Sequence, residues 1–187
     1  MTSGERDRKT TLRARLRAAR RSGAVPPMST EVLIAVAAFG VAAGQTVCAY
    51  LASRWEPGSS EMVEALRSHG LRVLLPVVVG DGLDWAEHDG RLRPGPFGLS
   101  EPAGPLLGAA AIGSAALVLA PALAVDHAGV RLGQGGGYYD RALGLSTGPV
   151  VAVVRDEEFV PSLPAEPHDV RVDAVLTPGR GLVRLPL

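Results

Sequence analysis

Residues 115–154 read AALVLAPALAVDHAGVRLGQGGGYYDRALGLSTGPVVAVV, with two apolar runs on either side of a glycine cluster. Ala115–Leu119 and Val150–Val154 are short and rich in Val, Leu and Ala, a composition that predicts two buried strands. Between them we expect a loop from about Gly129 and a helix that begins around Tyr138. A strand, a loop, a helix and a second strand form one unit of a parallel sheet, so this stretch indicates an α/β fold.

The rest of the chain alternates in the same way. Further helices are expected at residues 10–22, at 29–39 and from the turn at 56–59 to about 68, and further strands at 47–51, 71–79 and 174–176. Residues 80–99 are rich in Gly, Asp and Pro and predict a short hairpin. We therefore expect one three-layer, Rossmann-like α/β domain over residues 1–187, with a mostly parallel central sheet and helices on both faces. Ligands of such sheets bind beyond the carboxyl ends of the strands, which places residues 50–56 and 129–140 at one rim.

The charge of the chain is balanced overall but uneven along its length. Residues 1–21 hold eight basic and two acidic side chains, although the whole chain has 19 of each sign. A basic segment attracts an anion such as a nucleotide, a phospholipid or a nucleic acid, and a solvated helix face is the other interpretation. No aromatic residue lies between these basic residues, so nucleic-acid binding ranks last.

Composition also excludes several classes of protein. Val32–Ser53 and Ala103–Val125 are uncharged and long enough to cross a bilayer, but both are rich in Ala and Gly and contain helix breakers. We therefore expect no membrane span. Cys48 is the single cysteine, which excludes an internal disulfide framework, and its apolar neighbours indicate an inert buried thiol.

The glycine cluster has the composition of a phosphate-binding loop. Gly133 and residues 135–137 supply four glycines within five positions, so backbone amides can turn toward one anion without interference from Cβ atoms. Arg131 and Arg141 flank the cluster, and Asp140 follows as a carboxylate that suits Mg²⁺ beside phosphates. Two other interpretations stay open. A bare glycine cluster also forms a flexible turn, and Asp140 could cap the helix that follows.

The full string at residues 131–141, RLGQGGGYYDR, resembles the signature loop of the 5-formyltetrahydrofolate cyclo-ligases, also called 5,10-methenyltetrahydrofolate synthetases. Weaker matches to the same family lie in order along nearly the whole chain. They are Lys9–Arg13, Ala49–Leu51 with Glu56–Ser59, Val73–Pro76, Gly98–Pro102, and Leu163–Asp169 with Asp173 and Thr177. Ser60, Glu61 and Gln134 depart from the residues common in the family.

The resemblance implies an ATP-dependent ligase that uses Mg²⁺ and converts 5-formyltetrahydrofolate to 5,10-methenyltetrahydrofolate. In that reaction the formyl oxygen is phosphorylated, N10 closes the ring, and ADP and phosphate are released. The resemblance further implies a cytoplasmic monomer whose partner is a small reduced folate, with no nucleic acid and no membrane. Because of the three departures, a catalytically silent nucleotide- or folate-binding accessory or regulatory module of the same fold is the alternative.

The resemblance also implies roles for particular residues. Lys9, Arg13 and Arg131 are expected to act in catalysis. The expected ATP ligands are these three with Gly133, Gln134, Gly135, Gly136, Gly137, Tyr138 and Tyr139. The expected folate contacts are Leu51, Glu56, Gln134, Gly135, Gly136, Gly137 and Tyr138, and the expected magnesium ligands are Asp140 and Asp173. We also expect Lys9 and Asp140 at a solvated rim, and Pro167–His168–Asp169 to build a turn rather than supply an acid or base.

Overall fold

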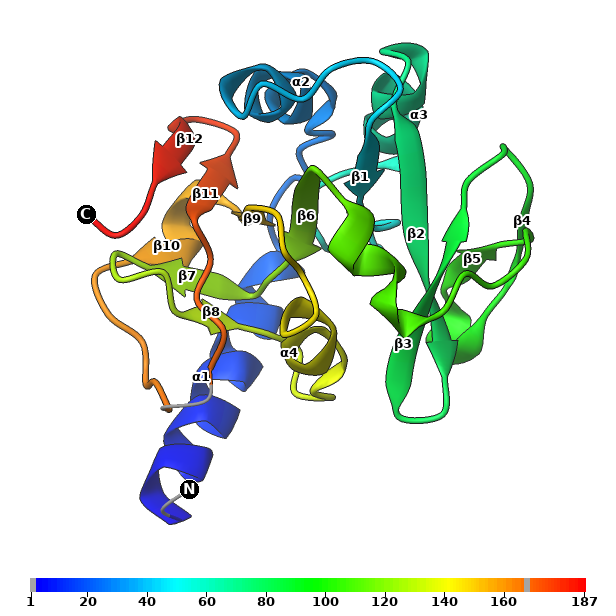
Figure 1. Cartoon of the computed structure of the whole chain (residues 1–187). Helices are drawn as coiled ribbons and strands as arrows, with labels where there is room; N and C mark the ends of the chain where they lie inside the picture. The colour runs from blue at the N-terminus through cyan, green and yellow to red at the C-terminus, as the bar shows by residue number, and fades with distance from the viewer. Residues whose placement is uncertain (1–2, 167–168) are drawn as a thin grey trace.

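A seven-stranded sheet forms the centre of the computed structural model, which describes residues 3–166 and 169–187 (Figure 1). The strand order is β12-β11-β9-β6-β1-β2-β3. The inner strands run parallel to one another and are β1 (Thr46–Cys48), β2 (Arg72–Val79), β6 (Leu117–Pro121), β9 (Val150–Val153) and β11 (Ala174–Thr177). The edge strands are antiparallel to their neighbours and are β3 (Gly82–Glu87) and β12 (Gly181–Arg184).

Helices cover both faces of this sheet. They are α2 (Ser29–Ala38) and α3 (Ser60–Ser68) on one face, and α4 (Tyr138–Leu143) with the 3₁₀ segment η2 (Ala109–Ser114) on the other. Successive side chains of a strand point to opposite faces, so Val47 packs among α2 and α3 while Cys48 packs on the side of α4 and η2. Because both faces are covered, the inner strands are apolar except for Thr46, Arg72 and Thr177 at their ends. The expected α/β fold, with helices on both faces of a mostly parallel sheet, is confirmed.

A second, smaller sheet holds the start of the glycine-rich segment. Its strands, in spatial order, are β10 (Phe159–Val160), β7 (Ala124–Asp126) and β8 (Arg131–Leu132). Asp126 turns the chain between β7 and β8, because its Oδ1 accepts hydrogen bonds from the backbone N–H groups of Ala128 and Val130, each at 2.9 Å. The loop expected from Gly129 therefore begins only after Leu132, and Arg131 is fixed in a strand.

The N-terminal helix α1 (Ser3–Arg20) begins earlier than the expected residue 10 and packs against the smaller sheet (Figure 1). Leu16 contacts a small apolar cluster that includes Leu123 and Leu132. At the end of the helix, Arg20 forms a buried pair with Glu158, with Nε 2.6 Å from Oε1 and Nη2 2.8 Å from Oε2. These contacts attach the basic helix beside the glycine-rich segment.

The remaining elements form a hairpin and two short 3₁₀ turns. The hairpin strands are β4 (Leu92–Pro94) and β5 (Ser100–Pro102), joined through η1 (Pro96–Gly98), and the other turn is η3 (Asp156–Glu158). The hairpin overlaps the region where the sequence predicts one, but it extends to Pro102. Within the described ranges, no helix has both the length and the apolar character needed to cross a bilayer.

Candidate active site

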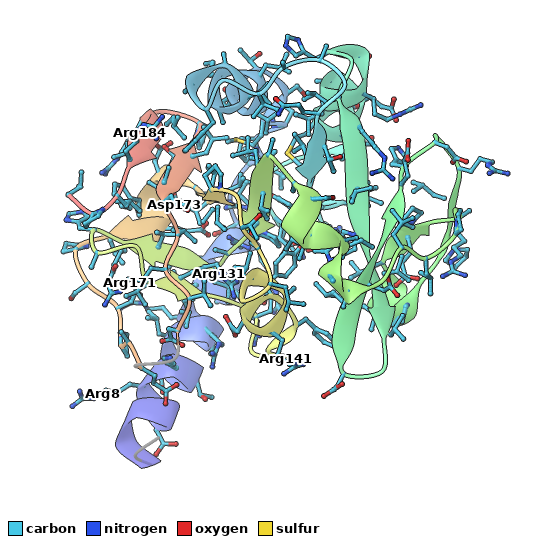
Figure 2. The ribbon with its side chains drawn as sticks, viewed as in Figure 1. Arg8, Arg131, Arg141, Arg171, Asp173 and Arg184 are labelled. Carbon is cyan, nitrogen blue, oxygen red and sulfur yellow. The ribbon has the colours of Figure 1, made fainter. Side chains whose placement is uncertain are left out.

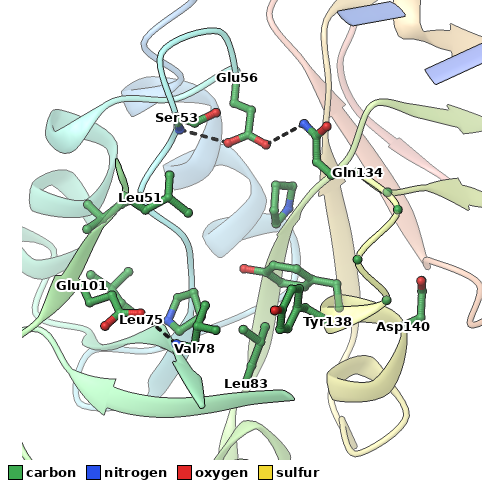
Figure 3. Close-up of a pocket in the computed structure, with 18 of the residues that line it drawn as sticks. Leu51, Ser53, Glu56, Leu75, Val78, Leu83, Glu101, Gln134, Tyr138 and Asp140 are labelled. Carbon is green, nitrogen blue, oxygen red and sulfur yellow. Dashed lines mark hydrogen bonds between the residues drawn. The ribbon is translucent and has the colours of Figure 1, made fainter. Parts of the chain in front are cut away.

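A cavity of about 460 Å³ opens beyond the carboxyl ends of the central strands (Figure 3). One wall is apolar and comes from the segment after β1, from β2 and β3, and from the β4–β5 hairpin. The other wall is the glycine loop with the start of α4. The lining residues are Leu51, Ser53, Glu56, Leu75, Pro76, Val78, Leu83, Leu99, Ser100, Glu101, Pro121, Arg131, Gly133, Gln134, Gly135, Gly136, Gly137, Tyr138, Tyr139 and Asp140. The rim that the sequence predicts therefore carries a cavity of the size that small ligands use.

The loop at residues 133–137 requires glycine at particular positions. Gly135 and Gly137 have φ angles of +105° and +72°, a region that side-chain-bearing residues rarely adopt. At Gly136 a Cβ atom would lie 2.8 Å from Cδ2 of Tyr138, and at Gly133 it would lie 2.8 Å from Nη1 of Arg131. The glycines therefore let the backbone approach the cavity and its aromatic and cationic neighbours closely.

Helix α1 binds the same loop through two arginines. Arg13 Nε donates a hydrogen bond of 3.0 Å to the carbonyl oxygen of Gly133. Arg17 donates to Gln134, with Nε 3.0 Å from Oε1 and Nη2 2.5 Å from the backbone oxygen. Arg13, an expected ATP ligand, therefore lies next to the loop, although it does not line the cavity. Arg17, for which the resemblance implies no role, holds the loop as well.

Arg131 points from β8 into the cavity wall, where its side chain is only 3% exposed. Its Nη1 donates to the carbonyl oxygen of Pro121 at 3.2 Å, and its Nη2 forms an ion pair with Oδ1 of Asp140. The guanidinium carbon also lies 5.8 Å from the centre of the Tyr139 ring. A fixed cation therefore faces the point at which the glycine loop turns into α4.

The two tyrosines after the glycines lie on the cavity wall. Tyr139 OH is buried and has no hydrogen-bond partner among the described residues. Burial raises the pKa of this phenol well above its ordinary value, so it stays neutral. Tyr138 lies beneath the guanidinium of Arg141, with 5.7 Å between Cζ and the ring centre.

Glu56 bridges the mouth of the cavity (Figure 3). Its Oε2 accepts a hydrogen bond of 2.9 Å from the backbone N–H of Ser53, and its Oε1 accepts one of 3.3 Å from Nε2 of Gln134. Leu51 lines the cavity on the same side. The structure therefore brings Leu51, Glu56 and Gln134, all expected folate contacts, to one rim.

Glu101 is a second cavity carboxylate, and the sequence reasoning missed its position. The residue is 6% exposed, and its Oε1 accepts a hydrogen bond of 2.8 Å from the backbone N–H of Val78. A Cβ atom at Gly95 would lie only 2.5 Å from Cγ of Glu101, so the hairpin needs glycine there. The segment at residues 98–102 resembles the family, but nothing in its composition indicates that this carboxylate turns inward.

Lys9 does not line the cavity and is not solvated. Its ammonium donates hydrogen bonds to Oδ2 of Asp169 at 2.9 Å and to Oε2 of Glu166 at 3.1 Å, and the residue is 8% exposed. Burial lowers the pKa of Lys9, but the hydrogen bonds to the two carboxylates outweigh that effect and raise it. The expectation of a solvated Lys9 is wrong, because the carboxylates of Glu166 and Asp169 cover its ammonium. His168, for which the sequence predicts a turn, lies outside the described residues.

Asp173 is held at a different place from Asp140. It precedes β11, and its Oδ2 accepts a hydrogen bond of 2.8 Å from the backbone N–H of Val150, the first residue of β9 (Figure 2). Asp140, through Arg131, lies near Pro121, the last residue of β6. The two carboxylates are thus anchored at opposite ends of parallel strands, and the structure does not bring them together as a magnesium pair.

Asp140 by itself suits a metal that is held mainly by phosphates. Its side chain is 47% exposed beside the glycine loop. No group of three or more His, Cys, Asp or Glu in the described part of the chain could hold a metal ion. Mg²⁺ commonly takes one or two protein carboxylates and completes its shell with phosphate oxygens and water. The donor set fits that mode of binding.

Comparisons with known proteins agree on one family. The model of the 5-formyltetrahydrofolate cyclo-ligase family matches residues 5–178. A 5-formyltetrahydrofolate cyclo-ligase of Mycolicibacterium smegmatis is 50% identical over 151 residues, which cover 76% of this chain and 78% of that protein. The enzyme of the same name from Escherichia coli is 31% identical over 149 residues, covering 75% of this chain and 81% of the relative.

Two solved structures share the fold. The NMR structure of Aquifex aeolicus 5,10-methenyltetrahydrofolate synthetase superposes with a TM-score of 0.78 at 24% identity, covering 95% of this chain and 92% of the other. The 5,10-methenyltetrahydrofolate synthetase of Mycoplasma pneumoniae superposes with a TM-score of 0.68 at 19% identity, covering 89% and 96%. At these identities the superpositions support the architecture described above.

Proposed function

This chain belongs to the 5-formyltetrahydrofolate cyclo-ligase family, and we propose that its cavity carries out the ATP-dependent conversion of 5-formyltetrahydrofolate to 5,10-methenyltetrahydrofolate. The observation that carries the proposal is the family match over residues 5–178, together with a cavity whose wall is the glycine loop and Arg131. ATP and a reduced folate are the two substrates.

The chemistry explains why ATP is consumed. A formamide oxygen is a poor leaving group, so N10 cannot close the ring on the formyl carbon unaided. Transfer of the γ-phosphoryl group to that oxygen gives ADP and a phosphate ester of an iminium-like carbon. N10 then attacks this carbon and loses its proton, and the oxygen departs as phosphate. Positioning and charge stabilisation supply most of the catalysis in phosphoryl transfer.

The glycine loop and Arg131 are the proposed phosphate ligands. Backbone amides at residues 133–137 would bind phosphate oxygens, and the buried guanidinium of Arg131 would stabilise charge that develops on the transferring group. Arg13, at the carbonyl of Gly133, is positioned to add a second cation. Lys9 would have to exchange its two carboxylate partners for phosphate, and we retain it as a proposed ligand on that condition.

The apolar wall and Glu56 are the proposed folate ligands. Leu51 and Tyr138 would pack against the ring system, and a carboxylate such as Glu56 can accept two N–H bonds from an aminopyrimidine edge. Glu56 must first release Gln134 for this purpose. The apolar lining excludes water, which strengthens the electrostatic contacts made in the cavity.

Asp140 would hold Mg²⁺ with the phosphate oxygens. The metal supplies positive charge that offsets the charge on the phosphoryl group. Asp140 is paired with Arg131, so metal binding would break this ion pair. Arg131 would then turn toward phosphate. The proposal keeps Asp140 alone as the protein carboxylate.

We further infer a cytoplasmic monomer that acts on a free reduced folate. Light scattering of the purified protein tests the oligomeric state.

The decisive experiment is an assay of the purified protein with ATP, Mg²⁺ and 5-formyltetrahydrofolate. We expect the near-ultraviolet absorbance of the methenyl product and an equal amount of ADP. Binding of ATP or the folate without ADP would instead identify a catalytically silent module. This alternative is considered because Gln134, Ser60 and Glu61 differ from the residues common in the family.

A further inference from the structure

A smaller crevice lies beside the main cavity, on the other side of the bridge between Glu56 and Gln134. Its volume is about 170 Å³. The lining residues are Arg17, Arg20, Arg21, Ser53, Trp55, Glu56 and Gln134. Three of these seven are arginines from the end of α1 and the turn after it, whereas Glu56 is the single carboxylate among them.

Arg20 is the buried part of this crevice. It is 2% exposed, and two of its nitrogens are used by Glu158. Its Nη1 is buried and has no hydrogen-bond partner among the described residues. A buried guanidinium N–H without an acceptor is costly and rare in folded proteins, so an acceptor from outside the chain would satisfy it.

The charge around the crevice is positive. Arg155 lies behind it, since its Nη2 donates to the backbone oxygens of Arg20 at 3.1 Å and Trp55 at 3.2 Å. Together with the three lining arginines this makes four guanidinium groups. The carboxylates that face them are Glu158, which is paired with Arg20, and Glu56, which holds Ser53 and Gln134. Four cations against two anions leave an excess that favours an anionic ligand.

Arg21 is the least committed of these cations. Its side chain is exposed just after α1, and no hydrogen bond or ion pair joins its guanidinium to another described residue, although its backbone N–H bonds to the carbonyl oxygen of Ala18. Arg17 in contrast already holds Gln134. Arg21 can therefore turn toward a bound group without breaking a contact of the protein.

The crevice is joined to the main cavity because Ser53, Glu56 and Gln134 line both. The main cavity, at about 460 Å³, suits one small ligand, so two substrates must extend beyond its rim. Both carry oxyanions at an end: ATP has phosphates, and the folate has glutamate carboxylates. Either end could cross the bridge if Glu56 releases Gln134.

We propose that the crevice formed by Arg17, Arg20 and Arg21 is a subsite for one oxyanionic group, a phosphate or a carboxylate, carried by a ligand whose remaining part occupies the main cavity. This inference rests on the proposed function for the identity of the two ligands. The acceptor oxygen would bond to Nη1 of Arg20 and to the guanidinium of Arg21, and displacement of Gln134 would open the connection.

Calorimetry on the full-length protein tests the subsite with Arg21→Gln, and Arg15→Gln is the matched control. Arg15 is an exposed arginine of the same helix that lines neither cavity, so both variants lose one charge. Each protein is titrated with MgATP, with 5-formyltetrahydrofolate, and with the pteroate analogue of that folate, which lacks the glutamate. One charge-assisted contact corresponds to roughly a five- to thirtyfold weakening of Kd.

The three titrations identify the source of the oxyanion. If Arg21→Gln weakens only MgATP, the group is a phosphate. If it weakens the folate but not the pteroate analogue, the group is a glutamate carboxylate. Arg21→Lys should restore part of the lost affinity in either case, and higher salt should reduce the difference between the variants.

Equal affinities of Arg21→Gln and Arg15→Gln for all three ligands would overturn the subsite, even if the unaltered protein forms methenyl product. Failure of both ATP and the folate to bind the unaltered protein would overturn the proposed function and the subsite together. Binding that depends on Arg21 without product formation would keep the subsite and remove only the catalytic claim.

Discussion

The ammonium nitrogen of Lys9 lies 2.9 Å from Oδ2 of Asp169, a residue 160 positions away. Lys9 is the only lysine of the chain, and Glu166 provides a second carboxylate at 3.1 Å. The cation proposed to bind phosphate is thus neutralised within the protein. If Lys9 binds phosphate as proposed, ATP must compete with these carboxylates, and the affinity for ATP then includes the free energy of breaking the pair.

Lys9→Ala should lower both stability and ATP affinity. The change leaves two carboxylates without their cation, and we expect a loss of about 2 kcal/mol in the free energy of unfolding. If Lys9 also reaches phosphate, the KM for ATP should rise roughly tenfold. Urea unfolding and steady-state kinetics measure the two effects. Arg8→Ala is the control, because Arg8 is an exposed neighbour on α1 (Figure 2). Unchanged stability of Lys9→Ala would show that the pair contributes nothing in solution.

Glu158→Gln should loosen α1 from the rest of the protein. Glu158 and Arg20 have side chains that are each 3% exposed, and removal of one partner of such a pair costs about 3–5 kcal/mol. Hydrogen exchange of α1 should accelerate more than that of β6 or β9. Glu157→Gln removes an exposed carboxylate at the adjacent position. It should leave the free energy of unfolding and the hydrogen exchange of α1 unchanged. Equal exchange in the two variants would contradict the role of this pair.

Gly135→Ala should damage catalysis more than stability. Gly135 has a φ of +105°, and alanine there is strained by about 1–2 kcal/mol. Gly40 has a φ of +66° with open space around it, so Gly40→Ala introduces comparable strain away from the cavity. We expect similar melting temperatures, but a fall in kcat/KM for ATP only in Gly135→Ala. An equal fall in kcat/KM for ATP in both variants would mean that backbone strain by itself lowers activity, and would contradict a direct role of the glycine loop in ATP binding.

Asp140→Asn should weaken the dependence of ATP binding on Mg²⁺, since an amide is a poorer ligand than a carboxylate. We expect the Mg²⁺ concentration for half-maximal activity to rise roughly tenfold. Asp173→Asn should leave this requirement unchanged and cost about 1 kcal/mol of stability, because Asp173 accepts a hydrogen bond from Val150. A Mg²⁺ requirement that shifts in Asp173→Asn but not in Asp140→Asn would reverse the assignment.

Alkaline pH should destabilise the fold through Cys48. Burial raises the pKa of this thiol from 9.0 to about 12. The contribution of the neutral, buried thiol to the free energy of unfolding is complete below pH 9. It is lost as the pH rises from 9 toward 12, because only the unfolded chain can ionise the thiol readily. The slope for this group is about 1.4 kcal/mol per pH unit. Between pH 8 and 10.5, the free energy of unfolding measured with urea should fall more steeply with pH in the unaltered protein than in Cys48→Ala. A thiol reagent should react with the native protein only slowly.

The sequence by itself determined the inner strands of the central sheet and the helices α2, α3 and α4 that cover it, but not the edge strand β12. Runs such as Ala174–Leu176 and Val150–Val154 are observed as Ala174–Thr177 and Val150–Val153. Burial of both faces of a parallel sheet demands apolar residues in an unbroken run, and that demand is visible locally. The glycine loop was also predictable from local sequence, but for a different reason. Positive φ angles at Gly135 and Gly137 exclude most other residues.

Only the tertiary structure decided which charged groups meet. Lys9 pairs with Asp169, Arg20 with Glu158, and Asp140 with Arg131 rather than with Asp173. The inward turn of Glu101 and the arginine crevice beside Glu56 were equally invisible in the sequence. An ion pair imposes no periodicity on either of its segments, because its partners come together only when the sheet and α1 have packed. Burial patterns are encoded residue by residue along the chain, whereas contacts between distant charges are set by the three-dimensional arrangement that burial produces.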